Sequence, residues 1–207
     1  MKKNIITILL IISGFICTFA ENRKSYYTLE LIEVECNEIP ANGSINNELQ
    51  MGLSVNSFQD SIIGILFEYE ATHINFTLTN SAKKTLKINW NDMVLFMEGA
   101  SHPVFHAGVK MSERCEEKAP TSVMKGLSHS DMIIPCDMVT WWEYSGRFLY
   151  EFLLKSQSSN IPVKILFPIE LNNQTYEYIF TFNAKYNAGK VKVVMVNGGM
   201  WEYVEVK

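Results

Sequence analysis

The sequence lacks every short motif that would mark a catalytic centre or a phosphate-binding loop. It contains no Gly-x-Ser-x-Gly elbow, no His-Glu-x-x-His pair and no glycine-rich phosphate loop. No arrangement of serine, histidine and aspartate stands out as a triad. The cysteines form no Cys-x-x-Cys pair and show no Cys/His spacing suited to zinc. We therefore expect a protein that is not an enzyme, with no metal site and no cofactor.

Charge of one sign is not concentrated anywhere in the chain. There are 18 Lys and Arg residues against 22 Asp and Glu residues, which gives a net charge of −4. No basic stripe and no acidic tail is present, so we expect no nucleic-acid partner. Internal repeats and low-complexity segments are also absent.

The chain has one long hydrophobic run, and it lies at the N-terminus. Lys2 and Lys3 precede it, and Ala20 ends a stretch of small residues after it. The run is shorter than the roughly 20 residues that span a membrane. A basic start, a short apolar run and a small-residue site are typical of a secretory signal peptide. We predict that residues 1–20 are this peptide, cleaved after Ala20, and that the protein is exported to the periplasm or cell surface.

Cys17 offers an alternative ending for this segment. A lipid-anchored protein carries its lipid on such a cysteine, and in that case the chain would be held on a membrane. The site for lipid attachment requires a small residue directly before the cysteine, where this chain has Ile16. Cleavage after Ala20 is the preferred interpretation, and the membrane is a partner only if Cys17 is lipidated.

The remaining chain is long enough for one domain with its own core. We assign residues 21–60 to an N-terminal extension with a possible strand at 27–36, and residues 61–207 to a β-sandwich domain. Alternation of apolar and polar residues carries this assignment, because successive side chains of a strand point to opposite faces. Two runs, 73–80 and 85–90, show it most clearly. Their predicted core residues are Ile74, Phe76, Leu78, Leu86, Ile88 and Trp90.

Turn residues connect these short strands throughout the chain. The polar link at 80–84 predicts that the runs on either side of it are antiparallel neighbours. Hairpins are predicted around Asn172-Asn173 and around residues 197–199. Residues 147–155 are predicted to form one or two helical turns. Little else has helical periodicity, so the sequence predicts an all-β, antiparallel β-sandwich.

Three cysteines remain after cleavage, and an odd number leaves at least one thiol unpaired in a monomer. Cys115 and Cys136 flank a short loop-and-strand unit and are predicted to form a disulfide. Cys36 lies in the strand predicted at 27–36 and is expected to be the unpaired thiol.

Three segments of the chain resemble an uncharacterised family of small exported bacterial proteins, many of them lipoproteins. They are Ile88-Asn89-Trp90, His106-Ala107-Gly108-Val109-Lys110 and Ile134-Pro135-Cys136-Asp137. The resemblance covers about residues 70–184. It implies an immunoglobulin-like sandwich and export, and it implies no catalytic activity.

Polar residues in the middle of the chain do not form a predicted metal or catalytic site. His102 and His106 would lie about 13 Å apart on a strand, too far to share one ion. The carboxylates of this region are interpreted as solvated loop residues. They are Glu113, Glu116, Glu117, Asp131 and Asp137.

Aromatic residues near position 140 give the best candidate for a binding surface. Trp141 and Trp142 are neighbours and so point to opposite faces of a strand, and Tyr144 follows. Together with Arg114 they are the residue types that anchor interfaces. We predict that they contact an envelope protein or a glycan; the opposing interpretation is that both tryptophans pack inside. The alternative function is a secreted hydrolase or a carbohydrate-binding protein.

Overall fold

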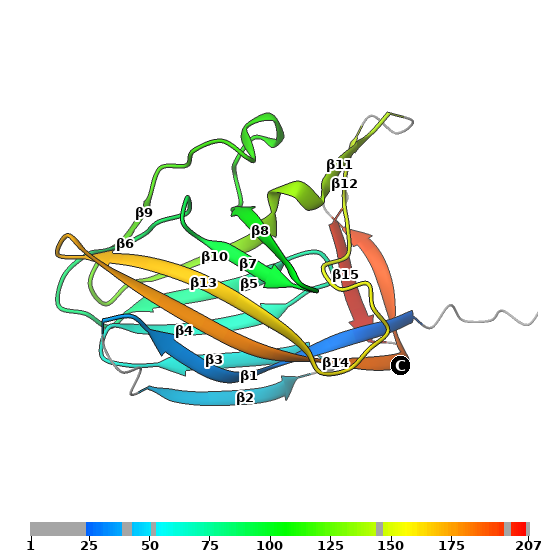
Figure 1. The fold of residues 1–207 in the computed structure, drawn as a ribbon, viewed down its shortest axis with the longest axis horizontal. Coiled ribbons are helices and arrows are strands. Elements are labelled where there is room, and N and C mark those ends of the chain that lie inside the picture. Colours follow the sequence, from blue (N-terminus) through cyan, green and yellow to red (C-terminus); the bar gives the residue numbers. More distant parts are fainter. Residues whose placement is uncertain (1–23, 39–42, 51–52, 144–146, 197–199, 206–207) are drawn as a thin grey trace, which may run out of the picture.

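The computed structural model describes residues 24–38, 43–50, 53–143, 147–196 and 200–205. This part of the chain is built from strands, two 3₁₀ turns and loops (Figure 1). The strands of the first half are β1 (Lys24–Cys36), β2 (Ser44–Gln50), β3 (Leu53–Gln59), β4 (Ile63–Tyr69), β5 (Ile74–Asn80), β6 (Leu86–Ile88), β7 (Val94–Met97) and β8 (Ala100–Phe105). Those of the second half are β9 (Thr121–Val123), β10 (Ser128–Pro135), β11 (Val139–Trp142), β12 (Arg147–Tyr150), β13 (Ile161–Leu171), β14 (Gln174–Val196) and β15 (Met200–Glu205). The 3₁₀ turns are η1 (Met111–Glu113) and η2 (Cys136–Met138).

Thirteen of the strands form one antiparallel sheet. Its order is β1-β14-β13-β7-β8-β10-β5-β4-β3-β2, with β15 beside β14, and with β6 between β13 and β9. Strand β10 pairs with both β5 and β8, and so joins the two halves of the sheet. The sheet curls until its two ends meet, which makes it a nearly closed barrel. β11 and β12 form a separate two-stranded hairpin.

In the described strands, this barrel is closed by side chains and not by a strand ladder. The main-chain N–H of Leu31 in β1 donates to Oδ1 of Asn56 in β3 over 2.9 Å. The carbonyl of Leu31 accepts from Nδ2 of Asn47 in β2 over 3.0 Å. A register shift next to Leu31 interrupts the ladder between β1 and β14. Two asparagines thus satisfy main-chain groups of β1 at the seam, where buried polar groups left unpaired would be costly.

The core lies between β3–β5 on one side and β13–β14 on the other. Phe67 of β4 packs against Phe180 of β14, with ring centroids 4.9 Å apart. Phe76 of β5 meets Phe167 of β13 at 5.2 Å. These edge-to-face contacts follow directly from the alternation, because every second residue of each strand points inward.

The predicted all-β, antiparallel architecture is confirmed, and so are the inward faces of two runs. β5 is buried at Ile74, Phe76 and Leu78, and β6 is buried at Leu86 and Ile88. Trp90 is 1% exposed, as its parity predicts. The β13–β14 hairpin turns at Asn172 and Asn173, whose φ angles of 56° and 62° are those of a tight primed turn.

Three expectations about the fold are corrected. β5 and β6 are not paired: β5 lies between β4 and β10, and β6 lies between β13 and β9. Residues 147–155 begin with strand β12 and contain no helix. Strands β1 to β3, before residue 61, lie within the thirteen-stranded sheet and not in an extension outside it.

The predicted signal peptide at 1–20 and the turn at 197–199 lie outside the described residues. Across the described ranges, no helix has the length and hydrophobicity needed to cross a membrane.

Candidate functional site

The aromatic residues predicted to bind a partner lie on the β11–β12 hairpin, which stands apart from the main sheet (Figure 1). Trp141 pairs with Phe148 across this hairpin, and their ring centroids are 4.9 Å apart in an edge-on contact. The Trp141 side chain is 50% exposed. A large aromatic surface is therefore presented to solvent and held from one side.

Arg114 supports this hairpin from the loop after η1. Its guanidinium carbon lies 5.8 Å from the centre of the Phe148 ring. Its nitrogens donate to three main-chain carbonyls, those of Met111, Cys136 and Val139, over 2.7 to 3.3 Å. Because these carbonyls occupy all three nitrogens, Arg114 positions the hairpin and the loop beneath it.

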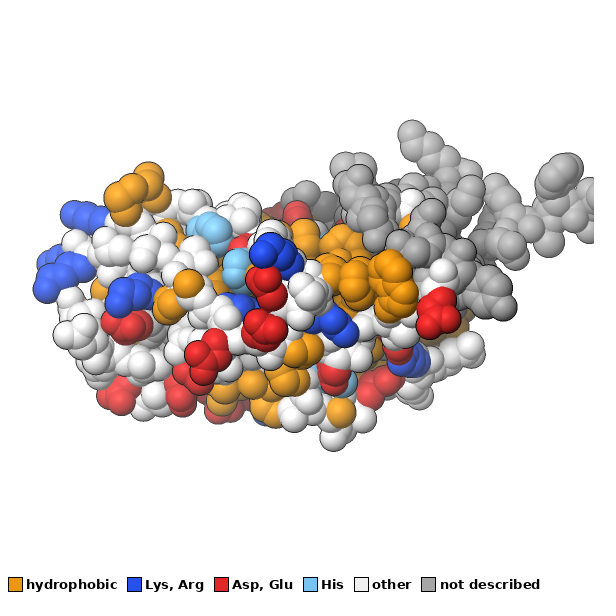
Figure 2. All heavy atoms as spheres, turned by 90° about the horizontal axis from the view of Figure 1, so that it is seen from above, with side chains coloured by type: hydrophobic (Ala, Val, Ile, Leu, Met, Phe, Trp, Pro, Cys, Tyr) orange, Lys and Arg blue, Asp and Glu red, His pale blue; other side chains and the backbone are white. Residues whose placement is uncertain are grey.

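Trp142 belongs to β11 by its backbone, and its partner across the hairpin is Arg147. Tyr144 lies outside the described residues. In the space-filling view, hydrophobic side chains gather beside the grey residues on the side where the hairpin lies (Figure 2). Of the predicted contact residues, the structure thus brings together Trp141 and Arg114, with Phe148 between them.

The cysteines of the described part are present as free thiols. Cys136 is buried in η2 and Cys115 is exposed. Burial, together with a hydrogen bond with Cys115, raises the pKa of the Cys136 thiol to about 12. The two thiols are therefore neighbours, and a disulfide between them stays a prediction. Cys36 is partly buried at the end of β1.

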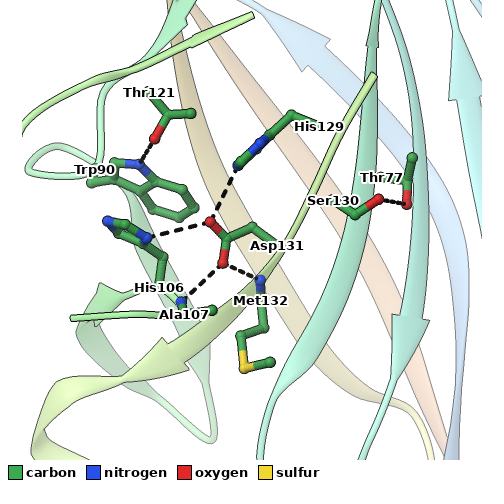
Figure 3. A network of polar contacts seen from close by, with 9 residues as sticks. All are labelled: Thr77, Trp90, His106, Ala107, Thr121, His129, Ser130, Asp131 and Met132. Carbon is green, nitrogen blue, oxygen red and sulfur yellow. Dashed lines mark hydrogen bonds and ion pairs between the residues drawn. The ribbon is translucent and has the colours of Figure 1, made fainter. Parts of the chain in front are cut away.

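Asp131 is the centre of a polar network that sequence reasoning missed (Figure 3). Its side chain is only 7% exposed, so the interpretation as a solvated loop carboxylate is wrong for this residue. It accepts hydrogen bonds from the main-chain N–H groups of Ala107 and Met132, at 2.9 and 2.8 Å. Nδ1 of His106 lies 3.3 Å and Nε2 of His129 3.2 Å from its Oδ2.

The network continues from His106 to Trp90. The imidazole stacks on the indole with ring centroids 4.3 Å apart and an interplanar angle of 20°. The indole N–H donates to Oγ1 of Thr121 over 2.8 Å. Asp131 thus connects β10 with the loop after β8, and through His106 and Trp90, which is two residues after β6, with Thr121 of β9. These are the segments that cover the side of the barrel where β6 and β9 are short.

Electrostatics favours an ionised Asp131. Burial by itself would raise the pKa of this carboxyl group. The contact with the His106 imidazole and the hydrogen bonds from the main-chain N–H groups of Met132 and Ala107 outweigh burial, and the pKa lies below its usual value. The carboxylate is therefore a negative charge that the fold itself stabilises.

A hydrolase would need a nucleophile in line with these imidazoles. Ser130 lies between His129 and Asp131 in the sequence, but alternation places it on the other face of β10. There its hydroxyl hydrogen-bonds with that of Thr77 at 2.9 Å (Figure 3). The histidine–carboxylate pairs therefore do not form a triad with Ser130. The same alternation could have revealed the network, since 129 and 131 share the parity of the buried Ile133.

The other histidines lie elsewhere. Nδ1 of His102 lies 2.9 Å from the carboxylate of Asp137, which is exposed. His73 is 2% exposed in the turn between β4 and β5. His102 and His106 thus have different carboxylate partners. Within the described ranges, no group of three or more His, Cys, Asp or Glu residues is arranged to hold a metal ion.

Comparison with protein-family models, with curated proteins and with solved structures finds no match to this chain.

Proposed function

We propose that this protein is an exported, non-enzymatic binding module of the cell envelope, and that it holds a partner protein through the β11–β12 hairpin. The observation that carries the proposal is the half-exposed Trp141, supported edge-on by Phe148. Exposed tryptophans on a supported surface are the residues that contribute most to protein interfaces. A projecting hairpin also lets a partner approach without disturbing the barrel.

The chemistry of the hairpin favours a protein partner. Behind Trp141 lies an apolar cluster of Phe105, Ile134, Cys136, Val139 and Tyr150, with Met111 and Phe148 packed against it. An aromatic anchor over an apolar base fits the apolar centre of a protein interface. Arg114 has its nitrogens committed to carbonyls, so it stiffens the hairpin, and a stiff surface loses less entropy on binding.

The resemblance to exported bacterial proteins belongs to the same proposal, as do the signal peptide and a periplasmic or cell-surface location. We also infer that the curled sheet is a variant of the immunoglobulin-like sandwich. In this variant β10 joins the two sheets, and the facing layers are β3–β5 and β13–β14. The packing of Phe67 on Phe180 and of Phe76 on Phe167 supports this description.

A pair of matched variants tests the proposed function. Trp141→Ala removes the anchor, and Met124→Ala removes another exposed side chain, 61% exposed, from the loop between β9 and β10. We expect the wild type and Met124→Ala to recover the same partner from an envelope extract, and Trp141→Ala to lose it. With the purified partner, Trp141→Ala should raise the dissociation constant by roughly 30-fold or more, which is the effect of losing an interface hot spot.

Both variants should keep the melting temperature of the wild type, because both side chains are exposed. Equal partner recovery by the wild type and by Trp141→Ala would remove the hairpin from the interface. Recovery of a glycan in place of a protein would refute the proposed class of partner.

A further inference from the structure

The turns at the end of the barrel away from the β11–β12 hairpin form a hollow lined by lysines. The hollow has a volume of about 530 Å³. Four lysines line it together with one carboxylate, Glu170, and with the two asparagines of the β13–β14 turn. The lysines are Lys83, Lys84, Lys87 and Lys125. Lys and Arg side chains gather at this left end in Figure 2, where Figure 1 places the β13–β14 turn.

Buried Asn80 fixes the backbone that carries three of these lysines. Asn80 is 1% exposed, and its Nδ2 donates to the carbonyls of Lys84 and Val123 over 2.9 and 2.8 Å. Its main chain exchanges hydrogen bonds of 3.0 Å with Gly126 and Leu127. The turn with Lys83 and Lys84 is therefore bonded to the turn with Lys125. The hydrogen bonds of Asn80 therefore hold the backbone of these lysines close together.

The fourth lysine is held in a different way. Lys87 of β6 lies opposite Glu170 of β13, and their side chains form an ion pair at 2.9 Å. Within the described part of the chain, no ion pair involves Lys83, Lys84 or Lys125. One carboxylate against four ammonium groups leaves a surplus of positive charge on a protein whose net charge is −4.

A surplus of this kind is unfavourable until an anion neutralises it. Like charges repel, and the repulsion grows as the distance between them falls. Lysine ammonium groups bind phosphate oxygens well as point charges. Asn172 and Asn173 line the same hollow, and an asparagine side-chain amide can donate further hydrogen bonds. A group with two or more negative charges would balance the charge of the three lysines that have no carboxylate as an ion-pair partner in the described part of the chain.

We propose that this lysine hollow binds a phosphate-bearing ligand, either an anionic lipid headgroup or a soluble oligophosphate. The site lies on another surface than the partner-binding hairpin, so it goes beyond the proposed function. Either ligand would place phosphate oxygens among Lys83, Lys84 and Lys125.

The experiment compares the full chain with two triple variants of equal charge. The first, Lys83→Gln/Lys84→Gln/Lys125→Gln, empties the hollow. The control, Lys110→Gln/Lys155→Gln/Lys164→Gln, removes the same charge from exposed positions elsewhere. Binding is measured to pyrophosphate by calorimetry, and to phosphatidylglycerol-containing and pure phosphatidylcholine vesicles by flotation. All of these side chains are on the surface, and a thermal melt of each variant verifies folding.

We expect the wild type and the control to bind, and the first variant to bind anionic vesicles roughly 100-fold more weakly, since each lysine near an anionic surface contributes about fivefold. If the protein binds anionic vesicles but not pyrophosphate, the ligand is a lipid headgroup. If it binds pyrophosphate but not the vesicles, the ligand is a soluble phosphate. Failure of the wild type to bind either ligand would overturn the proposal, and so would equal weakening in both triple variants.

Glu170→Gln adds a test that loss of folding cannot imitate. It removes the only carboxylate of the hollow and releases Lys87 from its ion pair. Affinity for the bound ligand should rise by roughly fivefold, the effect of one charge near such a site. Unchanged or weaker binding would contradict the assignment of the site.

Discussion

At the scale of single residues, Trp90 shows how one side chain serves both the core and a polar network. One face of its indole stacks on His106, its N–H bonds Thr121, and its ring lies 6.0 Å from that of Phe76. The alternation of its strand predicts burial but not these partners. His106 comes from the loop after β8 and Thr121 from β9, and both lie more than ten residues further along the chain.

Replacing Trp90 by alanine should therefore lower the free energy of unfolding by about 3–5 kcal/mol, because it leaves a cavity and an unpaired Thr121 hydroxyl. Urea unfolding measures this difference. Trp141→Ala is the matched control, and it should change stability by less than about 0.5 kcal/mol because that side chain is half exposed. Equal losses in the two variants would show that Trp90 is not a core residue.

His73 predicts a dependence of stability on pH. Burial lowers the pKa of this imidazole to about 4 from an ordinary value of 6.5. Between these values the unfolded chain binds a proton that the folded chain does not, so stability falls as the pH falls from 6.5 to 4. The loss should reach about 3 kcal/mol below pH 4.

Unfolding by urea at pH 7 and at pH 4 tests this prediction with His73→Gln, which removes the titration, and with His102→Gln as control. His73→Gln should flatten the pH dependence in this window, and His102→Gln should not. The lowered pKa of Asp131 also stabilises the fold at neutral pH, but that contribution is lost only below the ordinary pKa of 3.8, at the acid end. An unaltered pH profile in His73→Gln would mean that His73 titrates normally.

At the scale of elements, the sequence predicts the strands well and their neighbours poorly. Alternation alone locates β5, β6 and the β13–β14 hairpin, because burial of one face is a local property of the pattern. Pairing is decided by contacts that the pattern does not contain. Asn80 ends β5 and bonds to carbonyls at 84 and 123, and so turns the chain away from β4 and β10 toward β13. Nothing in the polar link at 80–84 distinguishes this crossing from an ordinary hairpin.

The candidate surfaces show the same contrast between what a local pattern predicts and what distant contacts decide. Trp141 could be singled out from the sequence, because an aromatic pair on one strand must point to both faces. The lysine hollow could not, since its residues lie on three turns and two strands and are up to 90 positions apart in the sequence. The role of Arg114 was likewise hidden, because its partners are main-chain carbonyls, which leave no trace in side-chain patterns.

The seam of the barrel gives a prediction about elements. Asn56→Ala should leave the buried N–H of Leu31 without its acceptor and lower stability by about 1–3 kcal/mol. Hydrogen exchange should show faster exchange at the Leu31 amide, while amides of β13 remain as slow as in the wild type. Ser57→Ala, at the next position and with a partly exposed side chain, is the control. A Leu31 amide as protected in Asn56→Ala as in the wild type would show that the seam is closed by other contacts.

At the scale of the whole molecule, the barrel holds its two proposed binding surfaces at different ends. Figure 1 places the β11–β12 hairpin at one end and the β13–β14 turn, beside the lysine hollow, at the other. The core between them is one continuous cluster that includes residues from β1 to β14. A partner on the hairpin would therefore leave the lysine hollow open, and the protein could join a protein partner to a phosphate-bearing surface.

The central claim is that the hairpin is the surface that meets a partner. The most direct measurement places a photo-crosslinking amino acid at Trp141 in cells that export the protein, with the same probe at Met124 as the reference position. The account predicts a discrete adduct with one envelope protein from position 141 and none from position 124. The same adduct from both positions, or no protein adduct from position 141, would contradict it.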